Sequence, residues 1–363
     1  MHLGLGLYAG LGLNGAEPDR DHLRFARQAG ATHIVAMLQN GEHGWSPTLA
    51  RSDAWEGGIF SKPRPERWTA DALSHMREVI ESEGLTLEAL ENFEPADWYD
   101  ILLDGPLRDE QVETLQGHIR AMGAAGIPVM SYNFTVAGVW GLNMEPVARG
   151  GAYSTHYDHP VETPIPRGMV WNETYDQHLV DTSPPEGVGE LSSTELWDRY
   201  TRFLKDIVPV AEEAGVKLAL HPDDPPVPTL RGQARLVHRP DIYDRVVDTV
   251  PSESNCIDFC IGSLVEVPDS DIYASIQHFG ERGKIALAEV RNVRGTVPDY
   301  REVFVDEGDT DISRVLSILS KSFDGVIFPD HTPVITSPSP WHAGMAYTLG
   351  WLRGTMQSLD ILS

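Results

Sequence analysis

Short apolar segments alternate with longer amphipathic segments along almost the whole chain. The short segments are rich in aliphatic and β-branched residues and are bounded by turn-forming residues, a pattern that predicts strands. Eight strands are expected, near Leu3–Tyr8, His33–Met37, Thr86–Leu90, Val129–Phe134, Lys217–His221, Cys256–Cys260, Ile285–Val290 and Gly325–Pro329. The longer segments predict eight helices, near Arg20–Ala29, Ala70–Ser82, Asp109–Ala124, Ser193–Glu213, Pro240–Thr249, Ser270–Phe279, Asp311–Ser322 and His342–Ser358.

The predicted strands and helices alternate, which is typical of a parallel sheet with crossover helices. Eight such units predict an α/β fold of the (β/α)8, or TIM barrel, class. Local signals agree, because Ser192-Ser193-Thr194-Glu195 offers an N-cap and Gly215 can end the same helix. No internal repeat or low-complexity linker divides the chain, so residues 1–363 are expected to form a single domain.

Two kinds of segment depart from this pattern. The stretch from about 140 to 185 is rich in Gly, Pro, Thr and Tyr, and we expect an irregular insertion after the fourth strand. In a barrel it would lie over the catalytic face, as a lid or an oligomer contact. Gly4-Leu5-Gly6 and Gly10-Leu11-Gly12 are not followed by a dinucleotide-type helix with an acidic partner, so we expect turns there and no nucleotide cofactor.

The charge of the chain narrows the classes of partner. With 54 acidic against 28 basic residues and a net charge of -26, the protein is not expected to bind nucleic acid or an anionic membrane. The sequence contains no apolar run of membrane-spanning length and no signal-peptide pattern, so a cytoplasmic location is expected. Lysine is scarce among the basic residues, which favours a halophilic protein over an ordinary acidic enzyme.

Metal-binding side chains follow four successive predicted strands. His221, Cys260, Glu289 and Asp330 end strands five to eight, and barrels of this class carry their chemistry at that end. A mixed set of N, S and O donors predicts a divalent metal such as Mn2+, Fe2+, Co2+ or Zn2+. Each residue also has a structural interpretation: a hydrogen-bonded His221, a buried Cys260 thiol, a Glu289 paired with an arginine and an Asp330 that caps the next segment.

Nearby residues supply candidates for acid–base chemistry and substrate binding. His331 adjoins Asp330 and is the expected general acid or base, since an imidazole titrates near neutrality. Arg291 is expected to clamp a substrate carboxylate or, alternatively, to form an internal salt bridge. Tyr347 is a candidate proton donor or a packing residue. Cys256 is expected in the core, and a disulfide between Cys256 and Cys260 is not expected.

Several motifs resemble those of the mannonate dehydratase family, within the xylose-isomerase-like barrels. The resemblance runs from about Leu3 to Leu359 and is firmest from Lys217 onward. It rests on Gly126-Ile127-Pro128-Val129, Tyr132-Asn133-Phe134, the run Gly215-Val216-Lys217-Leu218-Ala219-Leu220-His221-Pro222-Asp223-Asp224-Pro225-Pro226, Phe259-Cys260-Ile261-Gly262-Ser263, Phe328-Pro329-Asp330-His331 and Ala346-Tyr347-Thr348-Leu349-Gly350.

The resemblance implies a lyase that dehydrates D-mannonate to 2-dehydro-3-deoxy-D-gluconate in hexuronate breakdown, usually with Mn2+. By the family pattern His221, Cys260 and Asp330 would be ligands, and His331 and Tyr347 acid–base groups. Two features differ: Glu289 stands where the family usually has a histidine, and Ala137-Gly138-Val139-Trp140 replaces a more polar segment.

These departures leave alternative functions open. A sugar isomerase or epimerase on the same barrel would suit the carboxylate of Glu289, and an inactive sugar-binding barrel would require a lost ligand. Mg2+ is a further possible metal, and the expected partners are a small sugar acid and further copies of the chain, as a dimer or tetramer.

Overall fold

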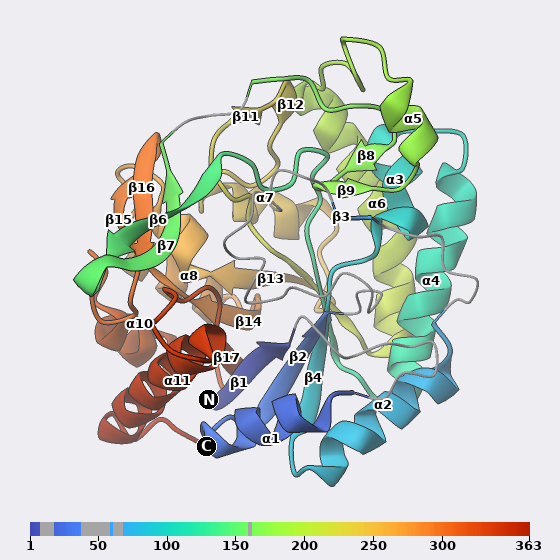
Figure 1. Ribbon diagram of the computed structural model, residues 1–363. Helices are drawn as coiled ribbons and strands as arrows, with labels where there is room; N and C mark the ends of the chain where they lie inside the picture. The colour runs from blue at the N-terminus through green and yellow to red at the C-terminus, as the bar shows by residue number, and fades with distance from the viewer. Residues whose placement is uncertain (8–17, 38–58, 61–67, 159–161) are drawn as a thin grey trace.

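Eight parallel strands close into a barrel in a computed structural model that describes residues 1–7, 18–37, 59–60, 68–158 and 162–363 (Figure 1). Around the barrel the order is β1–β17–β14–β13–β10–β5–β4–β2, so each strand lies beside its neighbour in the sequence of barrel strands. The strands are β1 (His2–Leu7), β2 (His33–Met37), β4 (Thr86–Glu91), β5 (Val129–Tyr132), β10 (Lys217–Leu220), β13 (Asn255–Cys260), β14 (Ile285–Val290) and β17 (Val326–Pro329). The predicted α/β barrel is therefore confirmed.

The expected turn at Gly4-Leu5-Gly6 is wrong, because these residues lie inside β1. Packing explains the glycine. A Cβ atom on Gly4 would lie 2.6 Å from Cγ1 of Val326 on the neighbouring strand β17, closer than carbon atoms approach. Tyr8 and the second expected turn, Gly10-Leu11-Gly12, lie outside the described residues.

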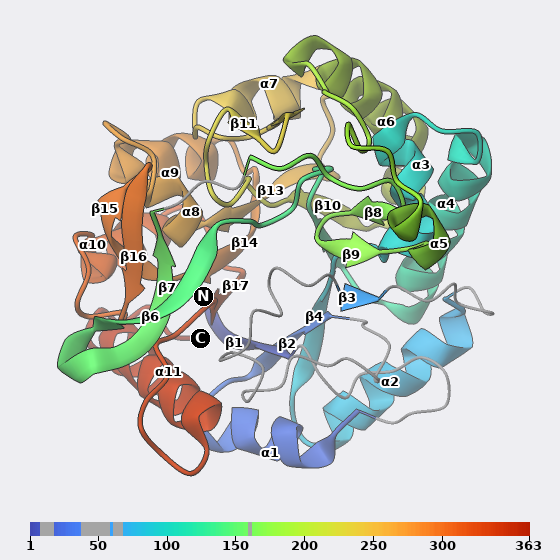
Figure 2. The ribbon, with the colours of Figure 1, turned by 45° about the horizontal axis from the view of Figure 1, so that its top comes forward.

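Helices surround the barrel, as Figures 1 and 2 show. All eight predicted helices are present, with ends shifted by a few residues: α1 (Arg20–Gln28), α2 (Ala70–Ser82), α4 (Arg108–Ala125), α6 (Ser193–Ala214), α7 (Ile242–Thr249), α9 (Ile272–Glu281), α10 (Ile312–Leu319) and α11 (Pro340–Ser358). Three shorter helices were not predicted from the sequence: α3 (Pro95–Leu103), α5 (Gln177–Asp181) and α8 (Ile261–Val265).

Helix α6 shows how local sequence sets the boundaries. Ser192 accepts a hydrogen bond from the backbone of Glu195, whose carboxylate accepts one from the backbone N–H of Ser192, so the two form a capping box. Gly215 ends the helix in the left-handed conformation, with φ of 69°, where a glycine has no Cβ to clash. The predicted start and end of this helix are confirmed.

Two apolar layers hold the barrel together. The larger packs the helices against the outer face of the strands, and a smaller cluster fills the barrel interior. Its members are Val35, Ala89, Val129, Ala219, Cys256, Ala286, Leu287, Val326 and Phe328. Burying one large aliphatic or aromatic side chain contributes about 1.5–3 kcal/mol. Cys256 thus lies in the core, as predicted, and both cysteines are free.

The described part of the stretch from 140 to 185 contains several regular elements, which corrects the expectation of an irregular insertion. It forms β6 (Leu142–Ala148) and β7 (Ala152–Tyr157), then β8 (Met169–Val170), β9 (Glu173–Thr174) and α5. Strands β6 and β7 join β15 (Asn292–Thr296) and β16 (Asp299–Val303) in a four-stranded sheet of order β15–β16–β7–β6, visible beside the barrel in Figure 2. Short two-residue strands form the small sheets β3–β9–β8, with β3 at Ile59–Phe60, and β11–β12, with β11 at Thr229–Leu230 and β12 at Gln233–Ala234.

Among the residues that the structure describes, no helix combines the length and apolarity needed to cross a bilayer.

Candidate metal centre and active site

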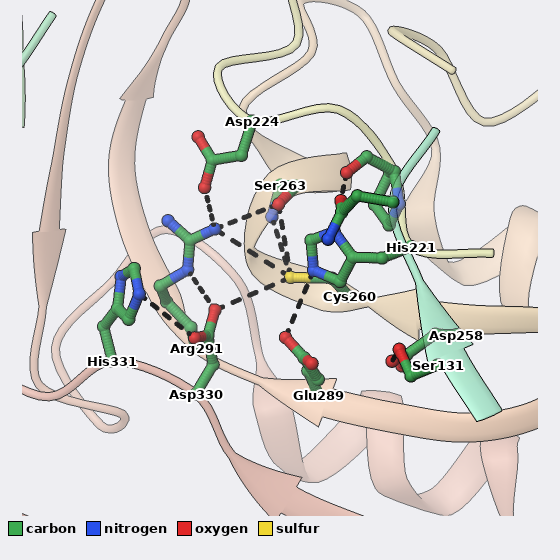
Figure 3. Close-up of polar contacts among 12 residues, drawn as sticks. Ser131, His221, Asp224, Asp258, Cys260, Ser263, Glu289, Arg291, Asp330 and His331 are labelled. Carbon is green, nitrogen blue, oxygen red and sulfur yellow. Dashed lines mark hydrogen bonds and ion pairs between the residues drawn. The ribbon is translucent and has the colours of Figure 1, made fainter. Parts of the chain in front are cut away.

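Three of the four predicted metal ligands converge at the ends of neighbouring barrel strands. His221 follows β10, Cys260 ends β13 and Glu289 is the penultimate residue of β14. One donor atom from each lies within 4.8 Å of the other two, and Figure 3 shows the side chains facing one another. Because metal–ligand bonds to N, O and S measure about 2.0–2.3 Å, donors around one ion must lie this close together.

The orientation of His221 fits metal binding. Its Nδ1 lies 2.6 Å from the carbonyl oxygen of Pro222, so Nδ1 donates the hydrogen bond and Nε2 points to the other donors. Nε2 lies 3.2 Å from Oε2 of Glu289. Two electron pairs cannot face each other at this distance without a cation between them, so either a proton or a metal ion must occupy the contact.

The negative charges around His221 also favour a cation between His221 and Glu289. Burial alone would lower the pKa of the imidazole, but the negative charges of Glu289 and Cys260 raise it well above its usual value. The site therefore attracts a positive charge in the position where a metal ion would bind. A divalent cation that replaces the proton leaves the imidazole neutral, as ligation requires.

Cys260 accepts two hydrogen bonds from Ser263 and, as the thiol, donates one to Oδ2 of Asp330 at 3.7 Å. Its Sγ is the N-cap of α8 and accepts from the backbone nitrogen of Ser263 at 3.4 Å and from the Ser263 hydroxyl at 3.2 Å. Burial raises the pKa of the thiol to about 11, although the nearby imidazole opposes this shift. Two donors aimed at the sulfur favour the thiolate, which is the form that binds metals.

Asp330 follows β17 and lies beside the three converging donors rather than among them. Its Oδ2 is 3.7 Å from Sγ of Cys260 and accepts a hydrogen bond from Nε of Arg291 at 2.9 Å. The arginine therefore fixes one oxygen of the carboxylate, and the role of Asp330 as a fourth ligand stays a proposal.

Arg291 is buried at the centre of a cage of four carboxylates, two of which, Asp224 and Asp330, are labelled in Figure 3. Its nitrogens donate to Asp224, Glu266, Glu302 and Asp330 at 2.7–2.9 Å, and to the hydroxyl of Ser263 at 3.0 Å. These contacts account for all five N–H groups of a guanidinium. The structure thus shows the internal salt bridge, the alternative interpretation, and leaves no donor for the expected carboxylate clamp.

Burial would lower the pKa of Arg291, but the surrounding carboxylates raise it well above its usual value. The guanidinium therefore keeps its charge. Since Glu266 and Glu302 are almost fully buried, this positive charge stabilises acids that would otherwise lose their protons only with difficulty.

His331 lies between two carboxylates at the rim of the cage. Its Nδ1 is 2.9 Å from Oε1 of Glu302, and its Nε2 is 3.3 Å from Oδ1 of Asp330. Burial lowers the pKa of the imidazole, but Asp330 and Glu302 raise it, to about 10. The side chain is partly exposed, while both ring nitrogens face carboxylates.

Tyr347 lies apart from the three converging donors, on α11. Its ring packs edge-on against Phe304, and its hydroxyl accepts a hydrogen bond from Arg149 at 3.1 Å. Burial and the neighbouring Asp306 raise the pKa of the phenol. In this arrangement the hydroxyl is bound to Arg149, which lies in the turn between β6 and β7 and pairs with Asp306.

Several buried acids around the site were not predicted from the sequence. Glu266 and Glu302 complete the cage, and Asp258 lies inside the barrel, where the hydroxyl of Ser131 donates to it at 2.5 Å. Burial first, and then Glu289, raise the pKa of Asp258 to about 8. Strand alternation was an available signal for Asp258, because it shares a face of β13 with Cys260.

Comparisons with known proteins identify the family of the chain. A family profile described as D-mannonate dehydratase (UxuA) matches residues 14–361. A mannonate dehydratase from Thermotoga petrophila is 30% identical over 77% of this chain and 82% of its own length. One from Lactococcus lactis subsp. lactis is 29% identical over 84% of this chain and 90% of its own length.

The structural comparison agrees over almost the whole chain. The crystal structure of mannonate dehydratase from Streptococcus suis serotype 2 superimposes with a TM-score of 0.73 and 22% identity, over 99% of this chain and 95% of that one. A profile match over nearly the full length, together with these relatives, shows that the chain belongs to the D-mannonate dehydratase family.

Proposed function

We propose that the protein is a metal-dependent hydro-lyase that converts D-mannonate to 2-dehydro-3-deoxy-D-gluconate and water. Family membership supports the reaction, and the convergence of His221, Cys260 and Glu289 supports a metal centre to carry it out. We propose Mn2+ as the metal, with Fe2+, Co2+, Zn2+ and Mg2+ as alternatives, because a mixed N, S and O donor set suits a borderline cation.

His221, Cys260 and Glu289 would hold the metal, with Asp330 as the fourth ligand. A bound divalent cation supplies Lewis-acid stabilisation of the negative charge that develops when the proton at C2 of the substrate leaves. Pro222 fixes the ring of His221, and Ser263 and Arg291 fix Cys260 and Asp330. Arg291 thus acts as a positioning residue in this proposal.

The departing C3 hydroxyl needs a proton, and we assign this role to His331. Its ring is held between Glu302 and Asp330, which favour the protonated form, and the side chain is partly exposed. A positioned acid of this kind contributes about 10²–10⁴-fold to the rate. Tyr347 stays a second candidate proton donor, and reaching the substrate would require its hydroxyl to leave Arg149.

The test is incubation of the metal-loaded protein with D-mannonate and detection of the 2-keto product by its semicarbazone absorbance. We expect product at a rate that falls after Cys260→Ser, because a hydroxyl is a poorer ligand for a borderline metal. A matched control is Cys256→Ser, since Cys256 lies in the barrel core and is not one of the three converging donors. Absence of product together with interconversion of ketoses would overturn the proposal.

Glu289 favours one alternative, a sugar isomerase or epimerase. A carboxylate in this position lowers the net charge of the centre by one relative to a histidine and so weakens the Lewis acidity of a bound metal. The same incubation with a panel of ketoses and aldoses, with and without Mn2+, distinguishes the two reactions.

A cytoplasmic location, a halophilic source and a homo-oligomeric state, dimer or tetramer, stay predictions of the sequence. Light scattering after size exclusion measures the last of these.

A further inference from the structure

Three arginines are buried among the described residues, and they differ in their partners. Arg291 contacts four carboxylates, and Arg235 pairs with Asp223 at 2.9 Å. Arg231, with 9% of its surface exposed, forms no ion pair with any described residue. In a chain with 54 acidic residues, a buried cation without a carboxylate is an exception that needs a physical reason.

The surroundings of Arg231 hold the guanidinium in place without neutralising it. Its Nε donates to the carbonyl of Thr163 at 2.7 Å, and its Nη2 donates to the carbonyl of Pro164 at 2.9 Å. The guanidinium carbon lies 4.0 Å from the ring centroid of Trp140. These partners are all neutral, and Nη1 has no hydrogen-bond partner among the described residues.

Trp140 has an unused donor as well. The indole is 6% exposed, and its Nε1 has no hydrogen-bond partner within the described part of the chain. The stacked pair therefore combines a positive charge with one N–H donor site on each side chain that has no hydrogen-bond partner among the described residues. Buried polar groups are rarely left without partners, so such a pair indicates a ligand or ordered water.

We infer that Arg231 and Trp140 form a binding subsite for a small oxyanion, a carboxylate or a phosphate. A planar guanidinium that is fixed through Nε and Nη2 presents Nη1 in a constant direction, and oxyanions are the ligands that match such donors. Burial lowers the pKa of Arg231 to about 10, the direction expected for a cation whose counter-ion is missing. Carbonyl groups alone do not supply that counter-charge.

The region of the subsite is linked to the cage around Arg291 through Arg235 and Asp224. Arg231 lies in the turn between β11 and β12, which are labelled at the top of Figure 1, and Trp140 lies in the segment between β5 and β6. Arg235 joins the two regions, since it donates to the carbonyl of Gly138 at 2.5 Å and to the carbonyl of Asp224 at 2.9 Å. The oxyanion can therefore belong to a substrate or be a separate ion such as phosphate.

Calorimetric titration of the metal-loaded protein with inorganic phosphate at constant ionic strength tests the subsite without requiring turnover. We expect saturable binding that Arg231→Gln weakens by about tenfold or more, as for loss of a charge-assisted hydrogen bond. Arg239→Gln is the charge-matched control, because Arg239 is 60% exposed and pairs with Asp241 at the surface. It should leave phosphate binding unchanged.

A second variant and a competition experiment complete the test. Trp140→Phe keeps an aromatic ring but removes the Nε1–H group, and it should also weaken phosphate binding. This variant tests the subsite even if Arg231→Gln fails to fold. Competition of D-mannonate with phosphate would assign the subsite to the substrate, and independent binding would assign it to a separate ion. No saturable binding of either anion, or equal binding by wild type and both variants, would overturn the inference.

Discussion

Replacement of Arg291 is the most direct test of how the site is built. Arg291→Met would leave Asp224, Glu266, Glu302 and Asp330 buried together without a cation. Removing one partner of a buried ion pair costs about 3–5 kcal/mol. With an unfolding entropy of about 2.1 cal/mol/K per residue, 363 residues give about 0.76 kcal/mol/K, so the Tm should fall by about 4–7 °C.

The charge-conserving variant Arg291→Lys separates charge from geometry. A lysine has three donors where the arginine has five, so at least one carboxylate loses its partner, at a cost of about 1–3 kcal/mol. Asp330 would also lose the donor that orients it, and metal affinity should fall by about 10–100-fold. Calorimetric unfolding and metal titration measure the two effects, with Arg239→Lys at the surface as control.

The stability lost in Arg291→Met should depend on pH in a definite direction. Without the guanidinium, the buried acids of the cage lose a positive charge that favours their ionised forms, so the folded variant binds more protons than the folded wild type does. The stability lost in Arg291→Met should therefore be larger at about pH 8 than at about pH 5. An Arg291→Lys protein that unfolds within about 1 kcal/mol of wild type and binds the metal equally well would refute the reasoning.

Three further predictions follow from the same site. Removal of the metal with a chelator should lower the Tm, and Mn2+ at about 100 times its Kd should restore about 2.7 kcal/mol, whereas an unchanged Tm would argue against a bound metal. His331→Gln should lower kcat by about 10²–10⁴-fold and leave metal affinity intact, and a parallel loss of metal binding would instead indicate a ligand. Asp258 has its pKa raised to about 8, first by burial and then by Glu289, so its contribution to stability is lost as the pH rises through about 4 to 8. Asp258→Asn should therefore stabilise the protein relative to wild type more at about pH 9 than at about pH 5, measured by urea unfolding, and a pH-independent difference would contradict this pKa.

The barrel was predictable because hydrophobic periodicity determines both of its layers. Strands such as β13 and β14 are buried on both faces and appear in the sequence as short continuous apolar runs, whereas α6 shows helical spacing and a capping box. The β6–β7 hairpin was missed because its residues are only partly buried and its polar side chains resemble those of a loop.

The ligand positions were predictable from strand ends, but their partners were not. His221, Cys260 and Glu289 each end a barrel strand or nearly so, and the closed barrel brings these ends together. The partners of Arg291 come from segments that no sequence pattern joins, since Glu266 lies just after α8 and Glu302 lies in β16. Whether an arginine faces a substrate or a buried carboxylate depends on tertiary packing that local spacing does not encode.

The four-stranded sheet limits which insertions and deletions the protein can accept during evolution. Strand β16 carries Tyr300, which donates to Asp224, and Glu302, which contacts Arg291 and His331. Side chains alternate between the faces of a strand, so one added residue in β16 would turn both of them away from the cage, whereas two would restore the face. The turn at Gly150–Gly151, where an added Cβ would meet nothing within 4 Å, has no such constraint. We therefore expect length variation among relatives at that turn, and conservation of length along β16.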